Sequence, residues 1–292
     1  MERWPNFFIV GAQRCGTTSL YEYLKQTPGI YMSPVKEPNF FSRIDPVYLT
    51  PSSIRDKKKY LALFKKVNNE IAIGEASPTY LQDPQAAKLI HDTVPNARII
   101  VMLRDPVERS FSHYLIRKGL GMETLPFRDA IKKALNSQDE YSRRVVEASF
   151  YSQQVKTYLD TFGKNLVKII IFEEFVKDVR SVVKDVLEFL QVNAEPPESI
   201  GEVHNPFNVP RGSFATFVLR SRFMLKIGAN LVPHAMGSFL VRNVLKKKET
   251  KPELSQEDRI FLEEIYCNDV KKLREILGRP IPWSLVKNLK ES

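Results

Sequence analysis

Two glycines and two threonines follow the first apolar run of the chain in a pattern that can hold a phosphate group. The run Phe7 to Val10 leads into Gly11-Ala-Gln-Arg-Cys-Gly16, and Thr17 and Thr18 then open a segment with helical periodicity. Glycines five residues apart let the backbone wrap around an anion, and the helix that follows adds its positive N-terminal end. The pattern favours a nucleotide phosphate as ligand, and the alternative is a strand-to-helix turn that binds nothing.

This loop differs from the phosphate loop of ordinary kinases and NTPases. In those proteins a Lys occupies the position of Thr17 here, and an Asp at the end of a strand holds magnesium. In this chain the cation of the loop is Arg14, and Asp105 follows a strand but lies beside Arg104. A degenerate P-loop kinase or NTPase therefore remains an alternative interpretation that lacks two of its expected parts.

A second strand-to-helix junction carries residues that suit another phosphate group. Arg104 lies at the carboxyl end of the run Arg98 to Leu103, where open α/β sheets bind their ligands. Pro106 suits a first helical turn, and Ser112 lies two turns further along that helix. We expect Arg104 and Ser112 to grip a second phosphate. The alternative is an Arg104 that pairs only with Asp105 or Glu108 on a solvated helix start.

Alternating strands and helices must position these residues. Short β-branched or aromatic runs bounded by turn residues predict buried strands at Phe7 to Val10, Ile71 to Ile73, Arg98 to Leu103 and Val167 to Phe172. Helical periodicity occurs at Thr17 to Gln26, Pro84 to Thr93, Pro106 to Lys118, Phe127 to Leu135, Tyr151 to Phe162, Val179 to Leu190 and Gln256 to Leu277. This alternation predicts an α/β fold with a central, mostly parallel sheet flanked by helices.

The composition is that of a globular, cationic protein. The 292 residues include 44 Lys and Arg against 34 Asp and Glu, a net charge of +10, and 43% are hydrophobic. That content can fill one core, so we expect a single domain over residues 1–292. The two cysteines, Cys15 and Cys267, form no disulfide or metal-binding pattern. With no signal peptide visible, the sequence predicts a soluble, cytoplasmic protein.

The positive charge leaves the class of partner open. A non-enzymatic nucleic-acid binder would use the basic runs Lys57 to Lys59, Lys65-Lys66 and Lys246 to Lys248, but these are dispersed and belong to no recognised module, so we expect no nucleic acid. The segment Phe214 to Lys248 combines apolar and basic residues. It is compatible with a peripheral membrane contact or a carrier-protein contact.

Together the two junctions resemble the 5′- and 3′-phosphate signatures of sulfotransferases that use 3′-phosphoadenosine 5′-phosphosulfate (PAPS). The resemblance is closest to the heparan-sulfate-like and bacterial branch and implies its three-layer, P-loop-like fold. Four further segments extend it along nearly the whole chain: Ser33-Pro-Val-Lys-Glu-Pro-Asn-Phe-Phe41, Gly74-Glu-Ala-Ser-Pro-Thr-Tyr80, Phe150-Tyr-Ser-Gln-Gln154, and the C-terminal Tyr266, Asp269, Leu273 and Trp283.

The resemblance implies a reaction and roles for particular residues. A sulfuryl group would pass from PAPS to a hydroxyl or amine of a carbohydrate, lipid or carrier-bound acceptor, without a metal. Catalytic roles fall on Glu37, Arg14 and His204. Donor binding falls on Arg14, Cys15, Gly16, Thr17, Thr18, Ser19, Arg104, Ser112, Arg211 and Gly212, and acceptor binding falls on Lys36, Phe40, Tyr80 and Tyr151.

Two of these assignments have plain alternatives. Taken without the family, Glu37 between Lys36 and Pro38 is a solvated turn carboxylate. With the family, it is the general base that accepts the proton of the acceptor. A lone loop histidine such as His204 is commonly solvated, and here it is also a rival base.

Overall fold

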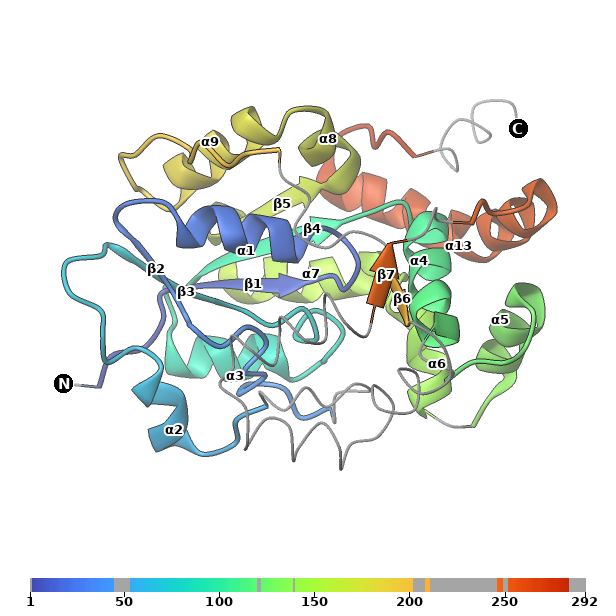
Figure 1. The fold of residues 1–292 in the computed structure, drawn as a ribbon, viewed down its shortest axis with the longest axis horizontal. Coiled ribbons are helices and arrows are strands. Elements are labelled where there is room, and N and C mark those ends of the chain that lie inside the picture. The colour runs from blue at the N-terminus through green and yellow to red at the C-terminus, as the bar shows by residue number, and fades with distance from the viewer. Residues whose placement is uncertain are drawn as a thin grey trace. The chain divides into compact units, whose positions relative to one another are not determined.

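Five parallel strands form the central sheet of the computed structural model, which describes residues 2–44, 53–119, 122–138, 140–201, 208–210, 246–248 and 252–283. The strands lie in the order β2-β3-β1-β4-β5, and every neighbouring pair is parallel (Figure 1). Their bounds are β1 (Phe7–Gly11), β2 (Ile30–Met32), β3 (Ala72–Ala76), β4 (Arg98–Leu103) and β5 (Val167–Ile171).

The strands at the centre of the sheet are apolar on both faces. All five residues of β1 are buried, and Ile99 to Leu103 of β4 have no exposed surface. Such continuous burial requires helices on both sides of a parallel sheet. The predicted α/β fold with a central parallel sheet flanked by helices is therefore confirmed.

The chain divides into two compact units. The first comprises Met1–Arg109, Glu147–His204 and Glu263–Ser292, and the second comprises Ser110–Val146 and Asn205–Leu262. The second unit contains α5 (Phe127–Asn136), α6 (Glu140–Glu147, whose last residue belongs to the first unit) and the antiparallel pair β6 (Asn208–Pro210) and β7 (Lys246–Lys248). It also includes most of α4 (Pro106–Gly119) and the first residues of α13 (Gln256–Leu277), helices that both units share. The single domain over residues 1–292 stays a prediction.

Eight further helices are described, of which all but α2 and α8 begin or end close to the predicted positions. They are α1 (Thr17–Lys25), α2 (Lys57–Ala62), α3 (Ala86–Thr93), α4 (Pro106–Gly119), α7 (Tyr151–Phe162), α8 (Phe172–Lys177), α9 (Val179–Phe189) and α13 (Gln256–Leu277), with a short 3-10 turn, η1 (Lys164–Leu166). The predictions for β4, α7 and α13 match residue for residue. Strand β3 begins one residue later than predicted and extends three residues further, to Ala76, so that its polar end contributes to the site described below.

Seven of the described elements were not predicted: β2, α2, α6, α8, η1, β6 and β7. For two of them the physical reason is plain. Strand β2 has three residues and pairs with β3 at the edge of the sheet, too short a run to show a periodicity. Helix α2 has only six residues, and Asp56 caps it by accepting a hydrogen bond from the Lys59 amide at 2.8 Å. A run of three lysines concealed this helix start.

A buried carboxylate docks α7 against α13. Asp269 of α13 accepts hydrogen bonds from the amides of Tyr151, at 2.6 Å, and of Ser152, at 3.1 Å, and also from the Ser152 hydroxyl. The first amides of a helix lack acceptors within the helix, so this side chain satisfies them from another helix. Asp269 therefore fixes the position of Tyr151 at the start of α7.

We predict that Asp269→Ala lowers the free energy of unfolding by about 2 to 3 kcal/mol, because it removes a cap and leaves buried amides without an acceptor. Urea denaturation measures the change. Asp178→Ala is the matched control, since Asp178 caps α9 through the Ser181 amide at 3.0 Å in an exposed position and should cost about 1 kcal/mol. Equal losses in the two variants would contradict a docking role for Asp269.

Candidate active site

The loop between β1 and α1 forms a concave backbone. Arg14 and Gly16 both have left-handed φ angles, of 72° and 86°, which turn successive amides toward one side. A Cβ atom at Gly16 would lie 2.9 Å from the Phe172 ring, so both the conformation and the available space require glycine there. Helix α1 begins directly afterwards, at Thr17, with no acidic residue in its first turn. The loop therefore presents amides and a helix N-terminus to an anion.

Arg14 supplies the positive charge of this loop. Burial and the neighbouring charge of Arg104 lower the pKa of Arg14 to about 10, while the Glu37 carboxylate raises it. The guanidinium stays protonated at neutral pH. Two arginine charges close enough to influence each other repel, and an anion bound to both relieves that repulsion.

Arg104 follows β4, the neighbour of β1 in the sheet. Its guanidinium lies 4.9 Å from the centre of the Phe172 ring and 3.3 Å from the Glu108 carboxylate. The Tyr151 hydroxyl donates to the Arg104 carbonyl at 3.0 Å. The Nε of Arg104 is buried, and none of the residues that the structure describes is its hydrogen-bond partner. Arg104 thus forms the ion pair with Glu108 that we considered as an alternative. That pair leaves the buried Nε–H of Arg104 available to a ligand.

Asp105 is not the partner of Arg104. Its carboxylate accepts from the amides of Val107, at 2.8 Å, and Glu108, at 3.4 Å, at the start of α4. Its own amide donates to Glu173 at 3.1 Å. Asp105 therefore shapes the turn that carries Arg104.

Phe172 connects the two cationic elements, and the sequence reasoning missed this role. The ring lies against Gly16 and also beneath the Arg104 guanidinium. We expected Phe172 to end a strand, whereas it opens α8. Its aromatic character at a strand end was the only signal of its function.

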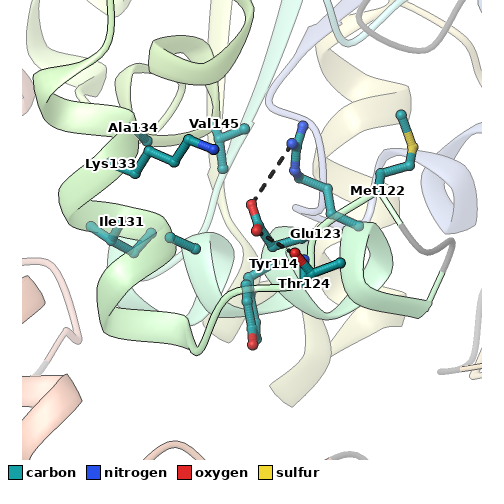
Figure 2. Close-up of a pocket in the computed structure, with 10 residues that line it drawn as sticks. Tyr114, Met122, Glu123, Thr124, Ile131, Lys133, Ala134 and Val145 are labelled. Atoms are coloured by element: carbon teal, nitrogen blue, oxygen red, sulfur yellow. Dashed lines mark hydrogen bonds and ion pairs between the residues drawn. The ribbon is translucent and has the colours of Figure 1, made fainter.

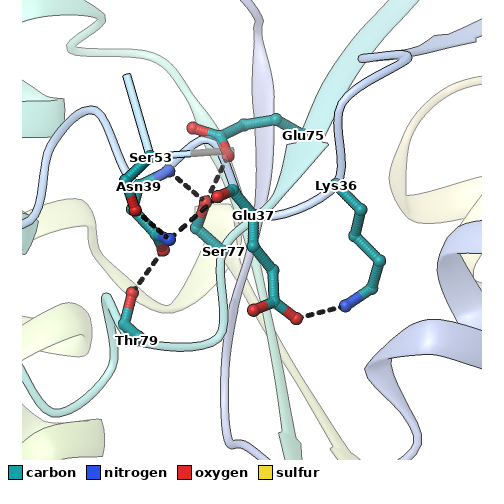
Figure 3. A network of polar contacts seen from close by, with 7 residues as sticks. All are labelled: Lys36, Glu37, Asn39, Ser53, Glu75, Ser77 and Thr79. Atoms are coloured by element: carbon teal, nitrogen blue, oxygen red, sulfur yellow. Dashed lines mark hydrogen bonds and ion pairs between the residues drawn. The ribbon is translucent and has the colours of Figure 1, made fainter. Parts of the chain in front are cut away.

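The segment Lys36 to Phe41, here called the strap, carries the candidate base. Glu37 has a φ of 61°, and its amide donates to the Ala76 carbonyl at the end of β3 at 2.9 Å. Its carboxylate lies 2.5 Å from the Lys36 ammonium, with 27% and 22% of the two side chains exposed (Figure 3). Glu37 is thus anchored to the sheet and is not a freely solvated turn carboxylate.

Three residues assigned to acceptor binding pack against other protein groups. Tyr80 and Tyr151 are fully buried, and the Tyr80 hydroxyl donates to Glu75 at 2.7 Å. Phe40 is half-buried and stacks on Tyr60 with 4.3 Å between ring centres. The contact of these side chains with the acceptor stays a prediction.

The thiol of Cys15 lies in the core of the protein. The side chain is fully buried, with its sulfur 3.9 Å from the Tyr151 hydroxyl. Burial raises the pKa of the thiol to about 11, so it is neutral and unreactive at physiological pH.

All of the predicted site residues stay predictions, and four of them are not placed beside the two arginines. Ser112 is buried on α4 in the second unit. His204, Arg211 and Gly212 lie outside the described residues.

The second unit has a pocket of its own, of about 150 Å³, formed by α4, α5, α6 and the connection between α4 and α5 (Figure 2). Arg117 and Glu123 line it with their charged atoms 3.9 Å apart, and Tyr114, Ile131 and Lys133 contribute further walls. Met122 and Thr124 of the same connection also border this pocket.

None of the helices among the described residues is long and apolar enough to span a membrane. The described residues also contain no group of three or more His, Cys, Asp or Glu side chains arranged to hold a metal ion.

The sequence matches known proteins along almost its whole length. A family model described as a sulfotransferase domain matches residues 5–275. Human carbohydrate sulfotransferase 15 is 28% identical over 245 residues, which cover 64% of this chain and 44% of that protein. The mouse bifunctional heparan sulfate N-deacetylase/N-sulfotransferase 4 is 24% identical over 298 residues, which cover 98% of this chain and 32% of that protein. The chain thus spans less than half the length of these curated relatives.

Comparison of structures agrees with the sequence match. The crystal structure of a sulfotransferase from Alicyclobacillus acidocaldarius is 32% identical, with a TM-score of 0.70 and coverage of 96% of this chain and 98% of that one. The relatives include both heparan sulfate enzymes and a bacterial protein, which confirms the branch inferred from the motifs, and the neighbour confirms the three-layer, P-loop-like fold. With its two cationic junctions and this match over residues 5–275, the chain belongs to the sulfotransferase family.

Proposed function

We propose that this chain transfers a sulfuryl group from PAPS to a hydroxyl or amine of an acceptor. One observation carries the proposal: two arginines, Arg14 and Arg104, follow the carboxyl ends of the adjacent strands β1 and β4, and their charges are close enough to interact. The Phe172 ring lies against both Gly16 of the first loop and the Arg104 guanidinium. Ligands of open α/β sheets bind at this edge. Two cationic sites at one edge suit a nucleotide with phosphate groups at two positions.

The residues present fit this donor. The loop amides and Arg14 would hold the 5′-phosphate, together with Cys15, Gly16, Thr17, Thr18 and Ser19. The buried Nε of Arg104, which has no hydrogen-bond partner in the described part of the chain, would meet the 3′-phosphate. Ser112, Arg211 and Gly212 are proposed to complete that second site.

Glu37 and its neighbours suit the transfer step. The Glu37 carboxylate would accept the proton of the acceptor hydroxyl or amine as its oxygen or nitrogen bonds to sulfur. The sulfur-to-oxygen bond of the donor breaks, and the nucleotide leaves as the 3′,5′-bisphosphate with Arg14 stabilising its charge. Lys36, 2.5 Å from Glu37, is placed to stabilise the sulfonate oxygens.

The acceptor is proposed by class only. Carbohydrate is favoured by the names of the relatives, and a lipid or carrier-bound molecule is the other choice. Transfer of labelled sulfate from PAPS to desulfated, partly N-deacetylated heparin, which offers hydroxyls and amines, tests the first class and separates O- from N-sulfation. A cytoplasmic location, and a peripheral membrane or carrier-protein contact, are further proposals.

Neither alternative function gains support. A P-loop kinase would need the Asp105 carboxylate for magnesium, but Asp105 accepts amide hydrogen bonds of α4. A nucleic-acid binder would need free lysines, but Lys57 pairs with Glu2 at 2.8 Å and lies over the Trp4 ring. We propose that no nucleic acid is bound.

The first prediction of this proposal concerns Arg104. Losing a charged hydrogen bond costs about 1.5 to 3 kcal/mol, so Arg104→Ala should weaken binding of 3′-phosphoadenosine 5′-phosphate (PAP) by about 10- to 150-fold and barely change AMP binding. Isothermal titration calorimetry measures both. Arg98→Ala, at the opposite end of the same strand, is the control and should bind PAP as the wild type does. Equal losses for AMP and PAP would argue against a 3′-phosphate site.

The second prediction concerns the base. Glu37→Gln should lower kcat by about 10²- to 10⁴-fold and leave PAP affinity nearly unchanged, because a general base contributes to proton transfer and not to donor binding. Steady-state transfer assays and calorimetry test the two halves. An active Glu37→Gln variant beside an inactive His204→Ala variant would assign the base to His204.

The third prediction concerns metal. Because Arg14 stabilises the leaving phosphate, transfer should continue at an unchanged rate in excess EDTA. An absolute requirement for a divalent ion in the same assay would overturn this.

A further inference from the structure

Glu75 is a fully buried carboxylate that the proposed mechanism does not use. It lies on β3, and it has no exposed surface. Tyr60 and Tyr80 donate to its Oε1 at 2.9 and 2.7 Å, and Ser77 donates to its Oε2 at 2.6 Å. A buried carboxylate is costly unless hydrogen bonds satisfy it, so a position of this kind calls for an explanation beyond packing.

Two routes lead from Glu75 to the strap, Lys36 to Phe41. The first passes through Ser77, whose hydroxyl accepts from the Asn39 amide at 3.1 Å (Figure 3). The second passes through Tyr80, whose hydroxyl accepts from the Phe41 amide at 3.2 Å. The carboxylate thus orients two hydroxyls that each hold one strap amide.

Asn39 connects Ser77 to the candidate base, Glu37, through hydrogen bonds. Its side-chain amide donates to the Glu37 carbonyl at 2.8 Å, and its side-chain oxygen accepts from Thr79 at 2.7 Å. Glu37 and Asn39 have φ angles of 61° and 52°, which side-chain-bearing residues adopt only at a cost of about 1 kcal/mol or more each. Asn39 forms hydrogen bonds with Ser77 and Thr79, and the Glu37 amide donates to the Ala76 carbonyl of the sheet. These hydrogen bonds offset the free-energy cost of the two φ angles.

The geometry points to Glu75 as the positioning residue of the base: its carboxylate, through Ser77 and Asn39 and through Tyr80 and Phe41, holds the strap in the conformation that presents Glu37 to the acceptor. This inference rests on the proposed function, in which Glu37 accepts the proton. Glu75 does not touch the acceptor or the donor and acts through the strap alone.

The ionisation state of Glu75 gives this role a measurable signature. Burial raises the pKa of Glu75 to about 7, against the opposing effect of the three hydroxyl donors. Burial also raises the pKa of Tyr60 and Tyr80 well above their ordinary range, so both stay donors. When Glu75 is ionised, all three hydroxyl hydrogens have acceptors. When it is protonated, its own hydrogen competes with one of them.

Glu75→Gln imitates the protonated state with the same shape. Its amide oxygen can accept from both tyrosines, while its NH₂ group faces Ser77 and displaces the Ser77 hydrogen. We expect kcat to fall by about 5- to 30-fold, the effect of about 1 to 2 kcal/mol, with PAP affinity unchanged. As the pH is raised, kcat of the wild type should increase with an inflection near pH 7, where Glu75 ionises. The Glu75→Gln variant should lack that inflection.

A double-mutant cycle in labelled-sulfate transfer from PAPS to desulfated, partly N-deacetylated heparin separates positioning from stability. In the Glu37→Gln background, Glu75→Gln should lower kcat no further, because it acts only through Glu37. Asp83→Asn is the control, since Asp83 is a buried carboxylate that holds the Ser42 hydroxyl at 2.9 Å and the Ile44 amide at 3.1 Å, beyond the strap. It should lower stability and keep the pH inflection.

Hydrogen exchange gives a readout that is independent of activity. The strap peptide should exchange faster in Glu75→Gln, and in Ser77→Ala if the first variant folds poorly, while β4 and α1 exchange as in the wild type. Loss of activity in Glu37→Gln with wild-type kcat in Glu75→Gln, or additive losses in the cycle, would overturn the inference. If the wild type transfers no sulfate but the strap loosens, the proposed function fails and the positioning of the strap stands.

Discussion

The structure depends on holding two arginine charges close together at one edge of a parallel sheet. Arg14 and Arg104 repel, and burial adds to the cost of the Arg14 charge. The surrounding structure fixes both arginines in place. Arg14 has a left-handed φ in the loop after β1, the Arg104 guanidinium contacts Phe172 and Glu108, and the Arg104 carbonyl accepts from the Tyr151 hydroxyl. An anionic ligand that neutralises both charges recovers that free energy on binding, which suits the site to a nucleotide with two phosphate positions.

The surrounding elements can be understood as supports of this edge. Asp269 fixes the start of α7 and so the position of Tyr151, whose hydroxyl holds the Arg104 carbonyl. Glu173 of α8 holds the Asp105 amide, and its other oxygen accepts from the Trp283 indole at 2.9 Å. Glu174 of the same helix pairs with Arg279 at 2.6 Å. The segment after α13 therefore braces α8, the helix that supplies Phe172.

The sequence was informative where a pattern is local and failed where a role arises from packing. The phosphate loop, β4 with Arg104, and the strap with Glu37 were predicted, because glycine spacing, β-branched runs and the family motif are written in consecutive residues. Phe172, Glu75 and Asn39 were missed as functional residues, since their contacts join segments that are distant in the sequence. Tyr80 and Tyr151 were assigned to the acceptor from motifs, and a motif names a residue but does not say whether its side chain faces solvent or the core. Glu75 could have been noticed as a single charge in the otherwise apolar strand Ala72–Ala76.

A 3′-phosphate site must distinguish the position of a phosphate group on the ribose and not merely its charge. Binding of 3′-phosphoadenosine 5′-phosphate and of its isomer adenosine 2′,5′-bisphosphate, measured side by side by calorimetry at the same salt concentration, tests this directly, because the two nucleotides carry the same charge and composition. We predict that the 3′,5′ isomer binds at least about 10-fold more tightly, the effect of one well-placed charged hydrogen bond. Equal affinities would contradict a built 3′-phosphate site and reduce the edge to a general anion-binding surface.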